Sequence, residues 1–104
     1  MASGKLASLD ITSAATDLLL YSCPNSKTAS FSVIMVNRSA SNVLVRIALT
    51  TSSSITADEY VAYDVTIYPG EVYERNGFVL SQGQFVYVRS SATSVNAVVC
   101  GYED

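Results

Sequence analysis

Short apolar segments separated by polar turns recur along almost the whole chain, and they constrain the fold more than any other feature. Within these segments apolar and polar residues tend to alternate, a period of two that places successive side chains on opposite faces of a β-strand. The clearest segment is 29–37, in which Phe31, Val33 and Met35 share one face. Short strands at this regular spacing are typical of a β-sandwich or a β-barrel.

Turn residues delimit the expected strands. Pro24 ends the second segment, because proline has no N–H for a strand ladder. Pro69-Gly70 predicts a type II turn, in which glycine supplies the positive φ. A short, weakly capped helix over 13–20 is the alternative to the second strand. The strands are expected at 4–11, 16–23, 29–37, 43–50, 60–68, 71–80, 84–91 and 94–102.

Length and residue type point to one all-β domain. The chain has 104 residues, the size of a single domain. It is strong in Val, Thr and Tyr, which fit a pleated and half-buried surface. The sequence therefore predicts a single domain over 1–104, a two-sheet antiparallel β-sandwich of about eight strands. Immunoglobulin-like and jelly-roll-like strand orders fit these segments equally well.

The stretch 68–91 holds three turn signals and much of the small stock of charge. A hairpin at Asn76-Gly77 would leave arms of only about five residues, so this pair predicts a bulge within one strand, 71–80. The next signal, at 81–84, lies between two longer apolar runs and predicts a hairpin.

Charge and hydropathy exclude several classes of function. The net charge is −3 and no run of Lys or Arg is present, which excludes a nucleic-acid binder. The start of the sequence lacks the features of a signal peptide, and no segment approaches the 18 or so apolar residues of a membrane span. We therefore expect synthesis in a cytoplasm and no membrane partner. Cys23 and Cys100 are expected to be free, small apolar residues rather than a disulfide.

Candidate catalytic groups are few. The chain has no histidine, the commonest general base, so a hydrolase triad cannot be built. Glu71, Glu74 and Asp64 are the carboxylates on which a small enzyme would depend, but the first two are three residues apart and face opposite ways in a regular strand. Asp58-Glu59 lacks the spacing of a calcium loop. We expect neither enzymatic activity nor a cofactor.

Tyrosines supply an alternative functional hypothesis, a carbohydrate- or receptor-binding module. Tyrosine rings can stack on sugars, and Tyr60 and Tyr102 lie near the ends of expected loops. The sequence has no tryptophan, however, and tyrosines on strand faces more often pack at the core edge or against a protein. The six tyrosines considered are Tyr60, Tyr63, Tyr68, Tyr73, Tyr87 and Tyr102.

Several strands are apolar on both faces, which a lone sandwich does not need. In 85–88 we expect Phe85 and Tyr87 on one side and Val86 and Val88 on the other. Burying an exposed Val or Ile contributes roughly 1.5–3 kcal/mol, so the surplus residues favour association with another protein surface. The interface candidates are Ile34, Val36, Leu44, Val86, Val88 and Val98.

The order of these segments resembles a known class of proteins. The strongest piece is "PGEVYERNGFVLSQGQFVYVRSS" (69–91), preceded by "VNR" (36–38), and the likeness extends over about residues 4–102. In this pattern the chain resembles the small β-sandwich virion structural proteins of tailed bacteriophages. These serve as capsid decoration (cement) proteins or as head, neck or tail components.

The resemblance implies a non-enzymatic part that docks onto a preformed particle. The implied partners are copies of the chain itself, with a trimer favoured, and the major capsid protein or other virion proteins. The implied location is the virion, after synthesis in the host cytoplasm. For the alternative, a carbohydrate- or receptor-binding module, the resemblance implies a place on a tail or fibre. Arginine forks bind carboxylates in two places at once, so the arginines are expected to fix the register of docking: Arg38, Arg46, Arg75 and Arg89.

Overall fold

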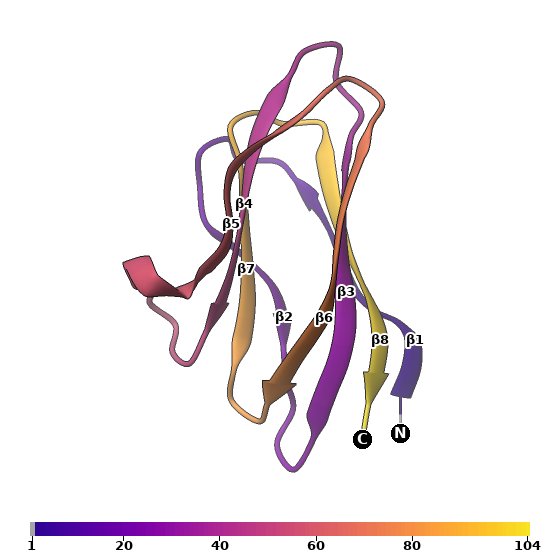
Figure 1. Cartoon of the computed structure of the whole chain (residues 1–104), viewed down its shortest axis with the longest axis vertical. Helices are drawn as coiled ribbons and strands as arrows, with labels where there is room; N and C mark the ends of the chain where they lie inside the picture. Colours follow the sequence, from indigo (N-terminus) through magenta and orange to yellow (C-terminus); the bar gives the residue numbers. More distant parts are fainter. Residues whose placement is uncertain (1) are drawn as a thin grey trace.

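The fold is an eight-stranded β-sandwich, as the sequence predicts. A computed structural model describes residues 2–104 as two antiparallel four-stranded sheets packed face to face (Figure 1). A turn of 3₁₀-helix, η1 (Ala57–Glu59), precedes the fifth strand. The strands are β1 (Ala2–Ile11), β2 (Leu18–Ser22), β3 (Thr28–Asn37), β4 (Val43–Thr50), β5 (Tyr60–Ile67), β6 (Val72–Ser81), β7 (Phe85–Ser90) and β8 (Val95–Glu103).

The strand order is that of a jelly roll. Sheet A has the order β1-β8-β3-β6 and sheet B the order β2-β7-β4-β5. The antiparallel pairs β1–β8, β2–β7, β3–β6 and β4–β5 are nested in the sequence, like one long ribbon whose successive pairs alternate between the two sheets. Of the two orders that the sequence leaves open, the jelly roll is the one that forms.

The local turn predictions are largely confirmed. Gly70 has a φ of 78°, and the N–H of Glu71 donates to the carbonyl of Tyr68 at 3.0 Å, as a type II turn requires. Asn76 and Gly77 together oppose one residue of β3, so the predicted bulge is present in β6. The alternative of a helix over 13–20 is wrong, since β2 begins at Leu18.

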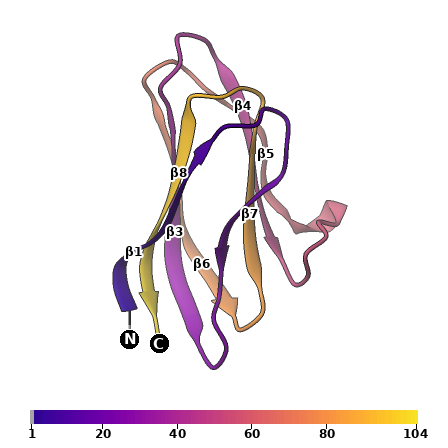
Figure 2. The ribbon, with the colours of Figure 1, turned by 180° about the vertical axis from the view of Figure 1, so that it is seen from behind.

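The predicted hairpin at 81–84 is wrong. A turn does form there, with the N–H of Gln84 donating to the carbonyl of Ser81 at 3.2 Å. However, β6 pairs with β3 in sheet A, whereas β7 lies between β2 and β4 in sheet B. The turn therefore carries the chain from one sheet to the other (Figures 1 and 2). A local turn signal does not specify which strand the next segment pairs with.

Val86 and Val88 are core residues, which corrects their assignment as interface candidates. Their exposed fractions are 0% and 1%. They lie directly opposite Leu49 and Ile47 of β4, so they belong to the inward row of sheet B, and Phe85 and Tyr87 face outward. Side chains alternate along a strand, so an error about which alternate set faces the core assigns every side chain of the strand to the wrong face.

One buried polar residue connects β3, the loop after it and the end of β5. Asn37 is 0% exposed. Its Nδ2 donates to the carbonyls of Ser41 (2.8 Å) and Ile67 (2.9 Å), and its Oδ1 accepts from the backbone N–H of Ser39 (2.9 Å). The side chain is thus satisfied by hydrogen bonds, which offsets the cost of burying it. It fixes the loop 38–42 at this end of the sandwich.

Candidate functional site

The outer face of sheet A, called the A face here, carries an apolar patch. Ile34 lies directly opposite Val98, and Val36 directly opposite Val72. Cys100 lies two residues from Val98 on the same face, since alternate residues of a strand share a face. The A-face patch is defined as Ile34, Val36, Val72, Val98 and Cys100.

Three of the six interface candidates therefore lie together, and the structure adds two residues that were not among the candidates, Val72 and Cys100. Ile34, Val36 and Val98 are each half-buried. Val72 is 58% exposed and lies on the same face as Glu74, two residues further along β6. The sequence shows that these two residues share a face, but it does not show that this face is the outer face of sheet A.

Polar groups surround the A-face patch. Asp10 and Arg38 form an exposed ion pair at one end, Lys5 lies opposite Cys100 on β1, and Glu74 lies opposite Ile34 on β6. Further along the same face, Tyr102 is 47% exposed. The A face is thus an apolar centre with a charged margin, the arrangement found in protein interfaces.

The outer face of sheet B, called the B face, differs in chemistry. Leu44, the remaining interface candidate, lies here and is 41% exposed. Four aromatic residues also lie on this face, Tyr60, Tyr63, Phe85 and Tyr87. Tyr60 and Tyr87 lie on either side of Ala48, which faces outward and is nevertheless only 1% exposed. The aromatic side chains of the B face are therefore partly engaged with their own sheet.

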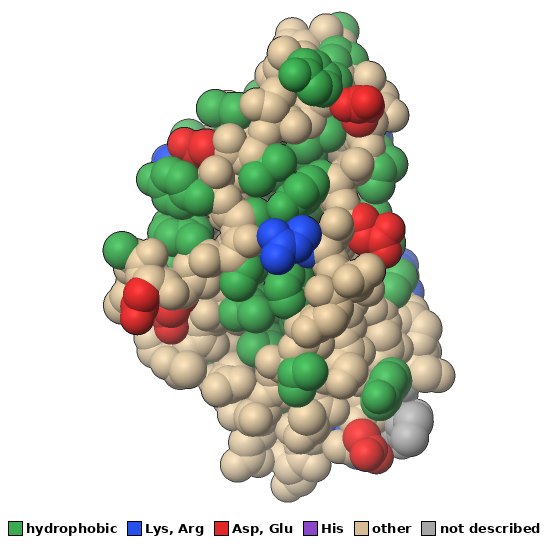
Figure 3. All heavy atoms as spheres, viewed as in Figure 1, with side chains coloured by type: hydrophobic (Ala, Val, Ile, Leu, Met, Phe, Trp, Pro, Cys, Tyr) green, Lys and Arg blue, Asp and Glu red, His purple; other side chains and the backbone are tan. Residues whose placement is uncertain are grey.

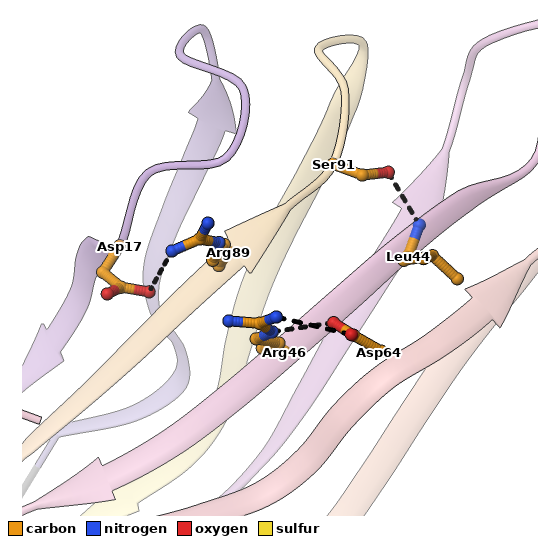
Figure 4. Close-up of polar contacts among 6 residues, drawn as sticks. All are labelled: Asp17, Leu44, Arg46, Asp64, Arg89 and Ser91. Atoms are coloured by element: carbon orange, nitrogen blue, oxygen red, sulfur yellow. Dashed lines mark hydrogen bonds and ion pairs between the residues drawn. The ribbon is translucent and has the colours of Figure 1, made fainter. Parts of the chain in front are cut away.

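Arg46 is the most constrained side chain of the B face. Its Nε and Nη2 donate to the two carboxylate oxygens of Asp64 at 2.7 and 3.3 Å (Figure 4). Its guanidinium also lies 4.0 Å from the ring centroid of Tyr63. The hydrogen bond from Arg46 holds the pKa of Asp64 below its ordinary value. Asp64 has a φ of 51°, a left-handed conformation uncommon for a residue other than glycine.

A second arginine lies beside the first. Arg89 of β7 is directly opposite Arg46 of β4, and its Nη1 lies 3.8 Å from Oδ1 of Asp17 (Figure 4). Like charges directly opposite each other destabilise a sheet, and here each arginine has its own carboxylate. Arg38 likewise pairs with Asp10. Three of the four arginines expected to bind a partner's carboxylates thus have carboxylates of their own chain nearby.

The fourth arginine closes the open edge between the two sheets. Arg75 of β6 faces the inner side, opposite Val33. Its Nη1 donates to the carbonyl of Val61 in β5 at 3.0 Å, and its guanidinium lies 5.9 Å from the ring centroid of Phe78. A band of hydrophobic side chains follows this edge, and basic side-chain atoms lie across its middle (Figure 3).

Each of the four edge strands contains a bulge. In β1 and β2 the extra residues are Leu6 and Leu20, in β5 the pair Tyr63-Asp64 opposes one residue of β4, and in β6 the pair Asn76-Gly77 opposes one residue of β3. Bulges interrupt the row of backbone groups that an edge strand offers to another strand. The edges are therefore poor sites for strand addition.

The carboxylates considered for catalysis do not come together. Glu71 lies in the turn before β6, Glu74 faces outward from sheet A, and Asp64 pairs with Arg46 on the B face. Glu59 accepts from the backbone N–H groups of Thr51 (3.2 Å) and Thr56 (2.9 Å) and braces the loop before η1. Among residues 2–104, no group of three or more His, Cys, Asp or Glu side chains is arranged to hold a metal ion.

The tyrosines are distributed over different surfaces. Tyr60, Tyr63 and Tyr87 lie on the B face, whereas Tyr102 lies on the A face. Tyr68 belongs to the turn after β5. The six tyrosines therefore do not form one stacking platform. Three of them share the B face, and of these Tyr60 and Tyr63 are in ring contact, with centroids 4.9 Å apart.

A seventh tyrosine forms a polar contact within the sandwich. The hydroxyl of Tyr21 donates to Oε2 of Glu103 at 2.5 Å. Burial and this neighbouring carboxylate raise the pKa of Tyr21 above its ordinary value, and burial likewise raises the pKa of the Cys23 thiol. Both cysteines are free, as expected, but only Cys23 is buried.

Comparisons with known proteins leave the family open. No family model and no curated protein matches the chain. Among residues 2–104, none of the helices has the length and apolar character needed to cross a membrane.

Proposed function

We propose that the chain is a non-enzymatic virion structural protein, a capsid decoration protein that docks onto the shell and stabilises it. The observation that carries this proposal is the A-face patch. Its five apolar side chains lie on two inner strands and one edge strand of sheet A, with charged residues only at the margin. The resemblance of the segments 36–38 and 69–91 to virion proteins of tailed bacteriophages supports the same function.

The patch favours contact by a face rather than by an edge. The bulges at Leu6, Leu20, Asp64 and Asn76-Gly77 disfavour strand addition. Sheets that pack face to face bury their side chains in a layer about 10 Å thick. The A face would pack in this way against a shell subunit or against sister copies, with a trimer favoured. Repetition of the contact over the particle would stabilise the shell.

The positions of the carboxylates support a role without catalysis. A general acid–base pair needs two groups that reach one reacting atom. Glu71, Glu74 and Asp64 lie in a turn, on the A face and on the B face, respectively. The position of each carboxylate is explained by exposure to solvent or by an ion pair, and none of these positions requires a catalytic role.

Quantitative peptide mass spectrometry of purified particles tests the location. A copy number in a simple ratio to the major shell protein is expected for decoration of the lattice. A copy number of a few to a few dozen would instead indicate a location in the neck, tail or fibre. Absence from the particle would contradict the proposal.

Substitution of the two faces tests the docking surface. Ile34→Lys and Val98→Lys place a charge within the A-face patch and are expected to abolish binding to particles that lack the protein. Leu44→Lys is the matched control, because Leu44 is 41% exposed on the B face. Circular dichroism confirms that each variant is folded. Equal loss of binding by Leu44→Lys would contradict the assignment of the A face.

A further inference from the structure

The B face contains a small hollow beside the Arg46–Asp64 pair. Its volume is about 160 Å³, and it is lined by Ala15, Leu44, Arg46, Asp64, Arg89 and Ser91. The charged residues of the lining are Arg46, Arg89 and Asp64. Asp17, the ion-pair partner of Arg89, lies on the far side of Arg89 and does not line the hollow (Figure 4). Two guanidinium groups therefore meet at one hollow on a chain whose net charge is −3, and each is balanced by one nearby carboxylate, Asp64 or Asp17.

Several hydrogen-bond donors of the hollow have no acceptor within residues 2–104. Arg89 donates no hydrogen bond there, and its contact with Asp17 is an ion pair at 3.8 Å. Arg46 uses Nε and Nη2 on Asp64, which leaves Nη1 without a partner. The hydroxyl of Ser91 accepts from the N–H of Leu44 at 2.9 Å, and its own proton has no acceptor. A guanidinium offers five donors in a planar fork that matches a carboxylate.

The hollow is held in shape before any ligand arrives. Arg46 is fixed from one side by two hydrogen bonds to Asp64 and from another by the ring of Tyr63. Asp64 is placed by the bulge in β5, where its positive φ costs backbone free energy. Side chains fixed in this way lose little freedom when a ligand binds.

We propose that this hollow binds an acidic sugar, such as a uronic acid or a sialic acid. The carboxylate would accept from Arg89 and from Nη1 of Arg46, and the ring hydroxyls would donate to Asp64 and accept from Ser91. Leu44 offers an apolar surface to the ring. The volume is well below the roughly 300–1,000 Å³ of clefts for drug-sized ligands, which suits one sugar unit. This site lies on the opposite sheet from the proposed docking face and goes beyond the proposed function.

Asp64 distinguishes a sugar from an acidic side chain of a partner protein. The carboxylate of a partner's Asp or Glu brings acceptors alone, and it would face Asp64 with nothing to donate. A sugar acid brings an anionic group and also hydroxyl donors. The mixed lining of the hollow therefore favours the sugar.

Titration of the isolated protein tests the proposal. ¹⁵N-labelled protein is titrated with glucuronate and with N-acetylneuraminate, and amide shifts are followed by NMR. We expect millimolar dissociation constants, with shifts at Ala15, Leu44 and Ser91. Arg89→Gln is expected to weaken binding at least about tenfold, as loss of hydrogen bonds to a charged group predicts. Arg38→Gln is the matched control, and it is expected to bind like the wild type.

Three outcomes would overturn the assignment. The first is the absence of amide shifts at these residues with either sugar acid. The second is equal binding of the neutral methyl glucoside, which would remove the role of the arginines. The third is equal binding of acetate, which would assign the hollow to a plain carboxylate such as a partner's side chain. Ser91→Ala, which tests hydroxyl recognition with little risk to folding, is expected to weaken binding of the sugar acids but not of acetate. None of these measurements depends on whether the protein docks on a particle.

Discussion

Arg75 and Val61 face each other across the open edge of the sandwich, where Nη1 of the arginine donates a 3.0 Å hydrogen bond to the carbonyl oxygen of the valine. The two residues belong to β6 and β5, which are edge strands of different sheets. An arginine that points inward from an edge strand blocks strand addition and covers the apolar core at the same time.

Replacement of Arg75 by alanine is therefore expected to destabilise the fold and to promote self-association. The loss should be about 1–2 kcal/mol, for the hydrogen bonds to the carbonyl of Val61 and the hydroxyl of Tyr73 and for one contact with Phe78. Urea unfolding and light scattering measure the two effects. Arg38→Ala, which breaks the exposed pair with Asp10, should cost less than about 1 kcal/mol. Equal effects of the two variants would show that Arg75 does not close the edge.

Gly101 is expected to tolerate no side chain. A Cβ at this position would lie 2.0 Å from the carbonyl oxygen of Ser30 and 2.6 Å from Cα of Phe31. These are backbone atoms of a neighbouring strand, which cannot move aside cheaply. Gly101→Ala should cost about 3 kcal/mol, the upper part of the usual range for overpacking. Calorimetric unfolding measures the loss, and an unchanged melting temperature would mean that β3 and β8 are farther apart than described.

Asn37 is expected to contribute to the stability of the fold by holding together the end of the sandwich where β3 ends. Asn37→Ala leaves the carbonyls of Ser41 and Ile67 without their donor and should cost about 1–3 kcal/mol. Chemical unfolding measures the difference. Asn42→Ala changes an exposed residue of the same loop and should stay within about 0.5 kcal/mol of the wild type. A larger effect at Asn42 would show that the loop, and not the buried amide, sets stability.

The stability of the protein is expected to decrease at alkaline pH through Tyr21. Its folded-state pKa lies above the ordinary value of 10.0, so its contribution is complete below that pH and is lost as the pH rises through the folded-state pKa. Urea midpoints measured from about pH 8 to about pH 11 should decline less steeply in Tyr21→Phe. Cys23 also has a raised pKa, and Cys23→Ala separates its share. Parallel curves for the wild type and Tyr21→Phe would contradict this role.

At acidic pH the sign is reversed for Asp64. Arg46 holds its folded-state pKa below the ordinary value of 3.8, so the ion pair stabilises the fold above that value. This contribution is lost as the pH falls through the folded-state pKa. Arg46→Gln should raise the pKa of Asp64 towards its ordinary value, which a ¹³C carboxyl titration by NMR detects. Arg75→Gln, on the opposite sheet, should leave that pKa unchanged. An unshifted Asp64 in Arg46→Gln would contradict the pairing.

The strand positions were predictable because two local signals agree. Period-two alternation gave β4 its observed bounds, and the Pro69-Gly70 and Asn76-Gly77 signals gave the turn and the bulge. Strand pairing was not predictable. The turn at 81–84 has the same local chemistry whether it joins neighbours or crosses between sheets.

The candidate sites were predictable only in part, for a related reason. The inward row of β7 was misassigned because both of its rows are apolar, so that alternation cannot choose between Val86 and Phe85. Ile34, Val36 and Val98 were placed correctly because Phe31, Val33 and Met35 mark the core side of β3. The Arg46–Asp64 pair had no local signal, since it depends on a bulge that places residues 18 positions apart side by side.

The nesting of the strand pairs also determines the order in which the molecule can be completed. β8 lies between β1 and β3, so while residues 95–103 are still inside the ribosome, β1 has no strand to pair with. Val98 and Cys100 of the A-face patch are then missing as well. Topologies dominated by such distant pairings fold slowly, in milliseconds to seconds. The apolar patch therefore forms only as folding is completed, which limits the time for which an incomplete chain presents it to other nascent chains.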